Sequence, residues 1–137
     1  MSSVPVNRSE KPAPLICVVD PDAATRRSVA ALLHALGADV EGYATAREFL
    51  ARLPSAVPVC VIADAHLPDM SGIALLQELR ARGHRIPTIL LSTDGDVTGA
   101  VDAMRAGALD FIEKPYIDRA LVTQVAPILD VDGHTAG

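Results

Sequence analysis

Four side chains suited to phosphoryl chemistry follow four strand-like runs of this chain. Asp20 follows residues 15–19, Asp64 follows residues 59–63, Ser92 follows residues 88–91, and Lys114 follows residues 110–113. Near-continuous apolar runs are typical of buried parallel strands, and the carboxyl ends of such strands line the crevice where open α/β sheets bind ligands. We therefore expect carboxylates, a hydroxyl and an ammonium group to converge on one edge of one sheet.

Segments with helical periodicity separate these runs. Val29, Leu32, Leu33 and Leu36 share one face of a predicted helix from Ala24 to Leu36, which Gly37 caps. Residues 39–44 are predicted as a further strand. Three further helices are predicted. The first opens with a capping box at Thr45 and Glu48 and is stopped by Pro54. The next carries Ile73, Leu76 and Leu79 and is closed by Gly83, and the last carries Val97, Ala100, Val101 and Met104 and is stopped at Gly107.

The two ends of the chain give weaker patterns. A fifth helix should open at Asp118 and end or kink at Pro127, because proline removes a backbone donor and clashes with the preceding turn. Residues 1–14 are polar, contain three prolines and have no period, so they are predicted to be a disordered leader. Residues 130–137 are predicted to be a flexible tail, which leaves residues 15–129 as one domain.

Five strands alternating with helices through short connections predict a parallel sheet covered on both faces, because each crossover helix must pack against the sheet. The fold class is therefore α/β, a (βα)5 three-layer sandwich. The chain has 137 residues, 50% of them hydrophobic, which suits a single domain with one core.

Composition also limits the function. The net charge of −5 argues against direct nucleic-acid binding, which needs a basic face. No apolar stretch has the length of a membrane span and no signal peptide is evident, so we expect a cytoplasmic protein without a membrane partner. Cys17 and Cys60 lie inside apolar runs without metal-ligand spacing and are predicted to be buried hydrophobic residues.

Taken together, these residues resemble a response-regulator receiver domain of two-component signalling, and most of all receivers of the nitrogen-fixation regulator type. The resemblance covers about Leu15 to Val125. It implies a flavodoxin-like fold with a five-stranded parallel sheet in the order 2-1-3-4-5. It is carried by Val18-Val19-Asp20, by Asp64 with Leu67-Pro68-Asp69-Met70-Ser71-Gly72, by Ser92, and by Asp110-Phe111-Ile112-Glu113-Lys114-Pro115.

The resemblance also implies roles for these residues. Asp64 would be the phosphoacceptor, taking a phosphoryl group from a phosphohistidine of a sensor histidine kinase or phosphotransfer protein. Lys114 and Ser92 would contact the phosphoryl oxygens, and Ser92 and Phe111 would form a conformational switch. The protein would then be no enzyme beyond its own phosphorylation and dephosphorylation on Asp64. Taken singly, Ser92 could also be a loop-capping hydroxyl, Lys114 a surface lysine, and Phe111 a core residue.

A Mg²⁺ ion is the cofactor that the resemblance implies, held by Asp20, Asp64 and the backbone carbonyl of His66. The family usually carries a second acid directly after the first, and here that position is Pro21. Either Asp22 reaches the metal or a water takes the place, so a weakened or altered metal site is expected. Asp22 could equally be the N-cap of the first helix. Asp69 is expected to cap or tighten the turn before Ser71 and Gly72.

Two other functions remain as alternatives. A degenerate receiver that binds partners without phosphorylation is favoured only by Pro21. An aspartate-nucleophile phosphatase of the haloacid-dehalogenase type would use Asp20 and Asp22 as paired aspartates. That second pattern then fails, because Ala24 stands where Thr or Val is expected and no later acidic pair follows.

Partner surfaces can be located from the same pattern. The exposed face of the first helix, around Arg26, Arg27, Ala30 and His34, is expected to select the partner. The expected switching surface comprises the fourth helix, the fifth strand and the fifth helix. Within it, residues 97–112 carry Asp102, Arg105 and Asp110, which could pair across a homodimer formed on phosphorylation. Because too few residues follow Val125 for a helix-turn-helix unit, the sequence favours a stand-alone receiver.

Overall fold

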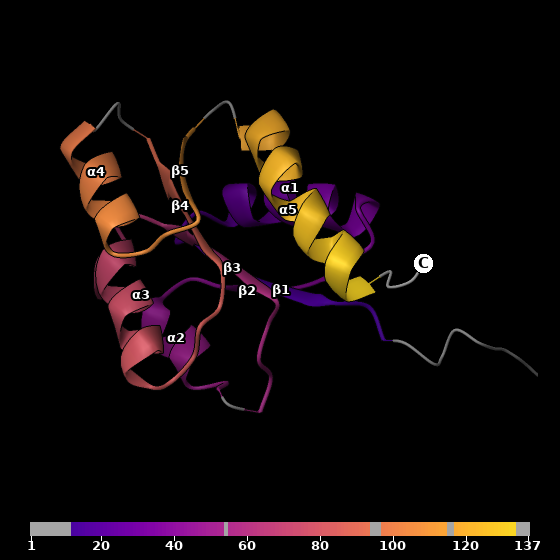
Figure 1. Cartoon of the computed structure of the whole chain (residues 1–137), viewed down its shortest axis with the longest axis horizontal. Coiled ribbons are helices and arrows are strands. Elements are labelled where there is room, and N and C mark those ends of the chain that lie inside the picture. The colour runs from indigo at the N-terminus through magenta and orange to yellow at the C-terminus, as the bar shows by residue number, and fades with distance from the viewer. Residues whose placement is uncertain (1–11, 54, 94–96, 115–116, 134–137) are drawn as a thin grey trace, which may run out of the picture.

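A computed structural model describes residues 12–53, 55–93, 97–114 and 117–133. Five strands alternate with five helices along them (Figure 1). In chain order the elements are β1 Leu15–Val19, α1 Ala23–Ala35, β2 Asp39–Tyr43, α2 Ala46–Leu50, β3 Cys60–Asp64, α3 Gly72–Ala81, β4 Thr88–Ser92, α4 Val97–Arg105, β5 Asp110–Glu113 and α5 Ile117–Gly133.

The five strands form one parallel sheet in the order β2-β1-β3-β4-β5, as the resemblance implied. All five residues of β3 and all five of β4 are buried, because helices cover both faces of the central strands. In the edge strand β2, by contrast, every residue is exposed or half-buried. The apolar runs of the sequence therefore identify the centre of the sheet.

Two core layers lie on opposite faces of the sheet. In Figure 1, α2, α3 and α4 stand on one side of the sheet, and α1 and α5 stand on the other. Phe49, Leu76 and Ala103 belong to the first layer, and Val29, Leu33 and Leu121 to the second. The predicted three-layer sandwich is confirmed. Among the described helices, none is both long and apolar enough to cross a membrane.

The two cysteines fall into different layers. Ile16 pairs with Cys60 and Cys17 with Val61, so the two thiols point to opposite faces of the sheet. Cys17 packs in the layer of α2 to α4, and Cys60 in the layer of α1 and α5. Burial raises the pKa of each thiol to about 12, and the prediction that both are buried hydrophobic residues is confirmed.

The last helix differs from its prediction. α5 continues through Pro127 to Gly133, so of the two outcomes expected at the proline, an end or a kink, the end is wrong. Leu121 and Val125 before the proline and Leu129 after it are all buried, while Pro127 is exposed. Burying a side chain such as Leu129 contributes about 1.5–3 kcal/mol, which is comparable with the roughly 3 kcal/mol that an interior proline costs.

The predicted ends of the domain are only partly within the described residues. α5 includes residues 130–133, which the sequence assigned to the tail, whereas residues 134–137 lie outside the described part. Residues 1–11 of the predicted leader also lie outside it. Pro14, in contrast, is tied to the sheet, because its carbonyl accepts a hydrogen bond from Asp39 N at 2.8 Å.

Helix ends follow the sequence signals closely. Gly37, after α1, has φ +97°, a left-handed conformation that suits its predicted place after a helix C-terminus. Thr45 Oγ1 accepts from Glu48 N at 3.2 Å, as in a capping box. The return bond differs, because Glu48 Oε1 accepts from Ala44 N rather than from the N–H of Thr45. α2 is also shorter than predicted and ends at Leu50.

Gly72, at the start of α3, allows a close approach of this helix to the end of β3. A Cβ atom at this position would lie 2.8 Å from the backbone oxygen of Asp64 and 2.8 Å from Leu90 Cδ2. Both neighbours are buried. The absence of a side chain therefore lets α3 begin directly beside the strand end that carries Asp64.

Replacing Gly72 with alanine should lower the free energy of unfolding by about 1–3 kcal/mol, the usual cost of overpacking. It should also shift the backbone amide resonances of residues 64–66, because the new methyl group presses on the Asp64 carbonyl. Gly37→Ala is the matched control: a Cβ there meets nothing within 4 Å, so only the cost of a positive φ remains. Urea unfolding and amide NMR check both effects, and unchanged stability of Gly72→Ala would contradict the close approach.

Candidate functional site

The carboxyl ends of β1 and β3 bring two aspartates together at the centre of the sheet. The two strands are neighbours, with Val19 paired to Ala63, so Asp20 and Asp64 lie side by side at the strand ends. Asp20 is 1% exposed and Asp64 is 8% exposed. Backbone bonds fix both positions: Asp20 N donates to Tyr43 O at 2.9 Å, and Ala65 N donates to Leu91 O at 2.7 Å.

Lys114 lies between the two carboxylates. Its Nζ donates to Asp20 Oδ2 at 3.0 Å and to Asp64 Oδ1 at 3.2 Å. Burial alone would lower the pKa of Lys114, but the hydrogen bonds and negative charges of Asp20 and Asp64 raise this pKa above its ordinary value. The lysine is therefore a stable ammonium ion that balances one of the two negative charges.

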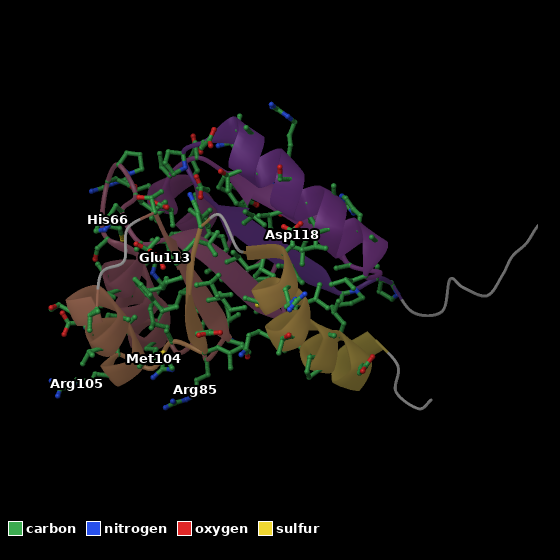
Figure 2. All side chains as sticks on the ribbon, turned by 90° about the horizontal axis from the view of Figure 1, so that it is seen from above. His66, Arg85, Met104, Arg105, Glu113 and Asp118 are labelled. Atoms are coloured by element: carbon green, nitrogen blue, oxygen red, sulfur yellow. The ribbon has the colours of Figure 1, made fainter. Side chains whose placement is uncertain are left out.

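The remaining oxygen of each carboxylate accepts a backbone N–H. Asp20 Oδ1 accepts from Asp22 N at 2.9 Å, and Asp64 Oδ2 accepts from His66 N at 3.0 Å. The side chain of His66 is exposed at the rim of this edge, where Figure 2 labels it together with Glu113. Each aspartate is thus held in place by one ammonium contact and one main-chain contact.

Ser92 is joined to this group through the main chain. It is the last residue of β4, is 1% exposed, and its carbonyl accepts from Lys114 N at 2.7 Å. Phe111 is half-buried in β5 beside Leu90 and packs against the layer of α2 to α4. These positions suit a core role and a switching role for Phe111 equally, so the switch stays a prediction.

Asp22 caps the first helix. Its Oδ1 accepts from Ala24 N at 3.1 Å and its Oδ2 from Thr25 Oγ1 at 2.8 Å. The hydrogen bond from the Thr25 hydroxyl, followed by that from the Ala24 N–H, lowers the pKa of Asp22. Pro21 beside it is exposed. The N-cap alternative is therefore observed, and both oxygens of Asp22 are engaged in it.

The donors at this edge suit a small, hard cation. Mg²⁺ is usually bound through one or two carboxylates, waters and substrate phosphate oxygens, and Asp20 with Asp64 supplies two carboxylates. Across the described ranges, no three His, Cys, Asp or Glu side chains gather closely enough to hold a metal. The residues present therefore fit Mg²⁺ only with a larger share of water or phosphate oxygens.

Arg26 belongs to the surroundings of the site, which the sequence did not predict. Its Nη1 donates to the backbone oxygen of Asp20 at 2.6 Å. Its side chain lies over Gly42, where a Cβ atom would come within 3.3 Å of Arg26 Cδ. Arg26 and Ala30 are half-buried, so the exposed face predicted for this helix is wrong at these two positions, whereas Arg27 and His34 are exposed as predicted. No short motif links an arginine to a carbonyl six residues earlier, so this contact could not be predicted from the sequence.

Asp69 also differs from its prediction. Its carboxylate does not cap its own turn but accepts from Ala46 N at 3.1 Å and Arg47 N at 2.9 Å, at the start of α2. The turn before α3 is capped instead by Ser71, whose Oγ accepts from Ala74 N at 3.0 Å. Because the partners of Asp69 lie 22 and 23 residues earlier in the chain, local spacing could not reveal them.

Comparisons with known proteins agree with this geometry. A family model described as the response regulator receiver domain matches residues 16–126. The transcriptional regulatory protein FixJ of Azorhizobium caulinodans is 41% identical over 111 residues, which cover 79% of this chain and 51% of that protein. The transcriptional regulatory protein TdiR of Thauera aromatica is 35% identical over 121 residues, covering 88% of this chain and 53% of TdiR.

Solved structures show the same likeness. The crystal structure of a response regulator receiver protein from Pseudoalteromonas atlantica has a TM-score of 0.79 and 38% identity, covering 86% of this chain and 98% of that one. The chain spans about half the length of the curated relatives it matches.

Proposed function

Because this chain belongs to the response regulator receiver domains of two-component signalling, we propose that Asp64 accepts a phosphoryl group from a phosphohistidine of a sensor histidine kinase or phosphotransfer protein. One observation carries the choice of nucleophile. The side chain of Asp64 is 12% exposed, whereas that of Asp20, which shares the same ammonium partner, is 1% exposed. Only Asp64 offers an oxygen that a large phosphodonor can approach.

The reaction is a phosphoryl transfer to a carboxylate. An oxygen of Asp64 attacks the phosphorus, the P–N bond of the phosphohistidine breaks, and its electron pair stays on the imidazole nitrogen. An acyl phosphate remains on Asp64. Lys114, now 3.2 Å from Asp64 Oδ1, is placed to pair with a phosphoryl oxygen, and Ser92 at the next strand end donates to another.

Receiver domains generally bind Mg²⁺, and here Asp20, Asp64 and the His66 carbonyl are the proposed ligands. When bound, the ion neutralises charge on the transferring phosphoryl group. We propose that the site is weakened, since Pro21 has no ligand to offer and Asp22 caps α1 with both oxygens. The only reaction we propose for the protein is phosphorylation and dephosphorylation of its own Asp64.

The two alternatives have less support. A phosphatase acting through Asp20 would need its nucleophile in the open, yet Asp20 is the more deeply buried of the two aspartates. A degenerate receiver is favoured by Pro21 alone. Action as a stand-alone receiver, and a cytoplasmic location, stay predictions.

Asp64→Asn should abolish phosphorylation by acetyl phosphate and Mg²⁺ and leave the fold intact, because asparagine is nearly isosteric and removes one of two crowded negative charges. Mass spectrometry of the intact protein should find a labile adduct of one phosphoryl group on the wild type only. Equal incorporation in Asp64→Asn would contradict the assignment. Phosphate release that persists in Asp64→Asn but is lost in Asp20→Asn would indicate the phosphatase, and no reaction of the wild type would favour the degenerate receiver.

Pro21→Asp should tighten Mg²⁺ binding and speed phosphorylation, because it restores a carboxylate to a site that is one ligand short. Isothermal titration of wild type, Pro21→Asp and Pro21→Ala with Mg²⁺ separates the effect of the added carboxylate on affinity from the effect of losing the proline ring. Only the aspartate variant should gain affinity. If its affinity equals that of the wild type, another group already supplies the ligand.

The output surface is proposed to be α4 and β5, residues 97–112. Val97 is 77% exposed, Val101 44% and Met104 49%, so α4 presents apolar side chains to solvent. Asp102 and Arg105 are exposed beside them, and Figure 2 shows Arg105 extending away from α4. Asp110 differs from its prediction, because it is half-buried and its Oδ1 accepts from Phe111 N at 2.7 Å. Apolar groups rimmed by charges of both signs suit a two-fold interface between phosphorylated copies.

Beryllofluoride, a phosphoryl mimic, should shift the protein from monomer to dimer in sedimentation velocity experiments. Met104→Asp should prevent the shift, since it places a charge in the apolar patch of α4. Val57→Asp is the matched control, because Val57 is similarly exposed at 50% but lies outside residues 97–112. A protein that remains monomeric with beryllofluoride would remove the dimer and leave the phosphorelay role in place.

A further inference from the structure

The loop that follows the acceptor aspartate is held to its own base by backbone contacts. Residues 65–71 connect β3 to α3, and Gly72 N closes the loop by donating to Ala65 O at 2.9 Å. His66 and Ser71 form an isolated antiparallel bridge. From this base, His66 N reaches back to Asp64 Oδ2 at 3.0 Å. The position of the Asp64 carboxylate therefore depends on where this loop is held.

Asp69 fastens the far part of the loop to a different element. α2 has only five residues, so its first backbone N–H groups cannot be satisfied within the helix. Asp69 accepts from Ala46 N and Arg47 N, and Thr45 Oγ1 accepts from Glu48 N. The further ion pair of Asp69 Oδ2 with Arg47 Nε, at 3.7 Å, involves an arginine side chain that is 80% exposed and adds little.

The start of α2 is in turn connected to the other site aspartate. The segment before it leaves β2 at Tyr43, whose carbonyl accepts from Asp20 N at 2.9 Å. Asp20 then meets Lys114, and Lys114 meets Asp64. The contacts therefore close a ring that runs from Asp64 through its loop to α2, on to Asp20, and back through the lysine.

We propose that Asp69 is a positioning residue for phosphoryl transfer, holding the loop so that the His66 N–H keeps the Asp64 carboxylate aimed at the phosphodonor. The inference rests on the proposed function of Asp64. Among the described residues, no hydrogen bond or ion pair joins Asp69 to Asp64 or to Lys114, so Asp69 acts through α2 and the loop. The hydrogen bonds from Arg47 N and Ala46 N outweigh the effect of burial and lower the pKa of Asp69, so it is a carboxylate at neutral pH.

Removing the carboxylate leaves two N–H donors of α2 without their partner and releases the loop. We expect Asp69→Ala to slow phosphorylation by acetyl phosphate by about tenfold, within the range up to about 10²-fold that a displacement near 1 Å can cost. Asp69→Asn, which keeps one acceptor oxygen and nearly the same shape, should fall between Asp69→Ala and the wild type. Glu78→Gln is the control, because it removes a carboxylate of α3 from an exposed ion pair with Arg82, the residue after the helix, and should change nothing.

Amide hydrogen exchange, followed by NMR, separates positioning from general stability. The amide of His66 should exchange faster in Asp69→Ala together with those of Ala46 and Arg47, while amides in the central strands β3 and β4 stay protected. Asp69→Asn replaces the alanine variant if that variant does not fold. The rates of phosphorylation and of amide exchange are compared between proteins at equal folded fraction.

The outcomes distinguish this inference from the proposed function. A wild type that accepts no phosphoryl group removes the proposed function and with it the role of Asp69 in phosphoryl transfer, while His66 exchange still shows whether Asp69 holds the loop. A wild type that is phosphorylated no faster than Asp69→Ala or Asp69→Asn overturns the inference and leaves the function of Asp64 standing. Unchanged exchange at His66 in both variants also overturns it.

Discussion

Two carboxylates brought to neighbouring strand ends at the centre of the sheet repel one another, and Lys114 makes their proximity tolerable. Asp20 and Asp64 are both largely shielded from water. Charges interact more strongly in the protein interior than at its surface, so the repulsion between the two is strong. The ammonium group reaches them from the end of β5, which is separated from β3 by β4. A residue as small as Ser92 at the end of β4 suits this arrangement, because the lysine must pass over that strand end.

The sequence predicts the elements and the edge of the sheet well because both depend on simple patterns. Buried parallel strands require apolar runs, and the first polar residue after each run marks the strand end, so Asp20, Asp64 and Lys114 could be placed together. Strand order came only from the resemblance, because periodicity carries no information on which strands are neighbours. Pro127 shows where local propensity fails, because core contacts on both sides of it keep α5 continuous.

The contacts of individual polar side chains are the part that the sequence could not supply. Asp22, Arg26 and Asp69 each make hydrogen bonds that any short or flexible polar side chain could make with several different backbone groups. Which group is used depends on the packing of neighbouring elements. The sequence limited the possible roles of Asp22 to two, because its partners are two and three residues away. The partners of Asp69 lie at the start of another helix, so the sequence did not indicate them.

The placement of Cys17 and Cys60 has a practical consequence. One thiol lies under α2 to α4 and the other under α1 and α5, with β1 and β3 carrying them on opposite faces of one sheet. A thiol-specific reagent can reach Cys17 only when the first helical layer separates from the sheet, and Cys60 only when the second does. The native chain thus contains its own pair of reporters, which distinguish a fluctuation of one layer from a fluctuation of the other.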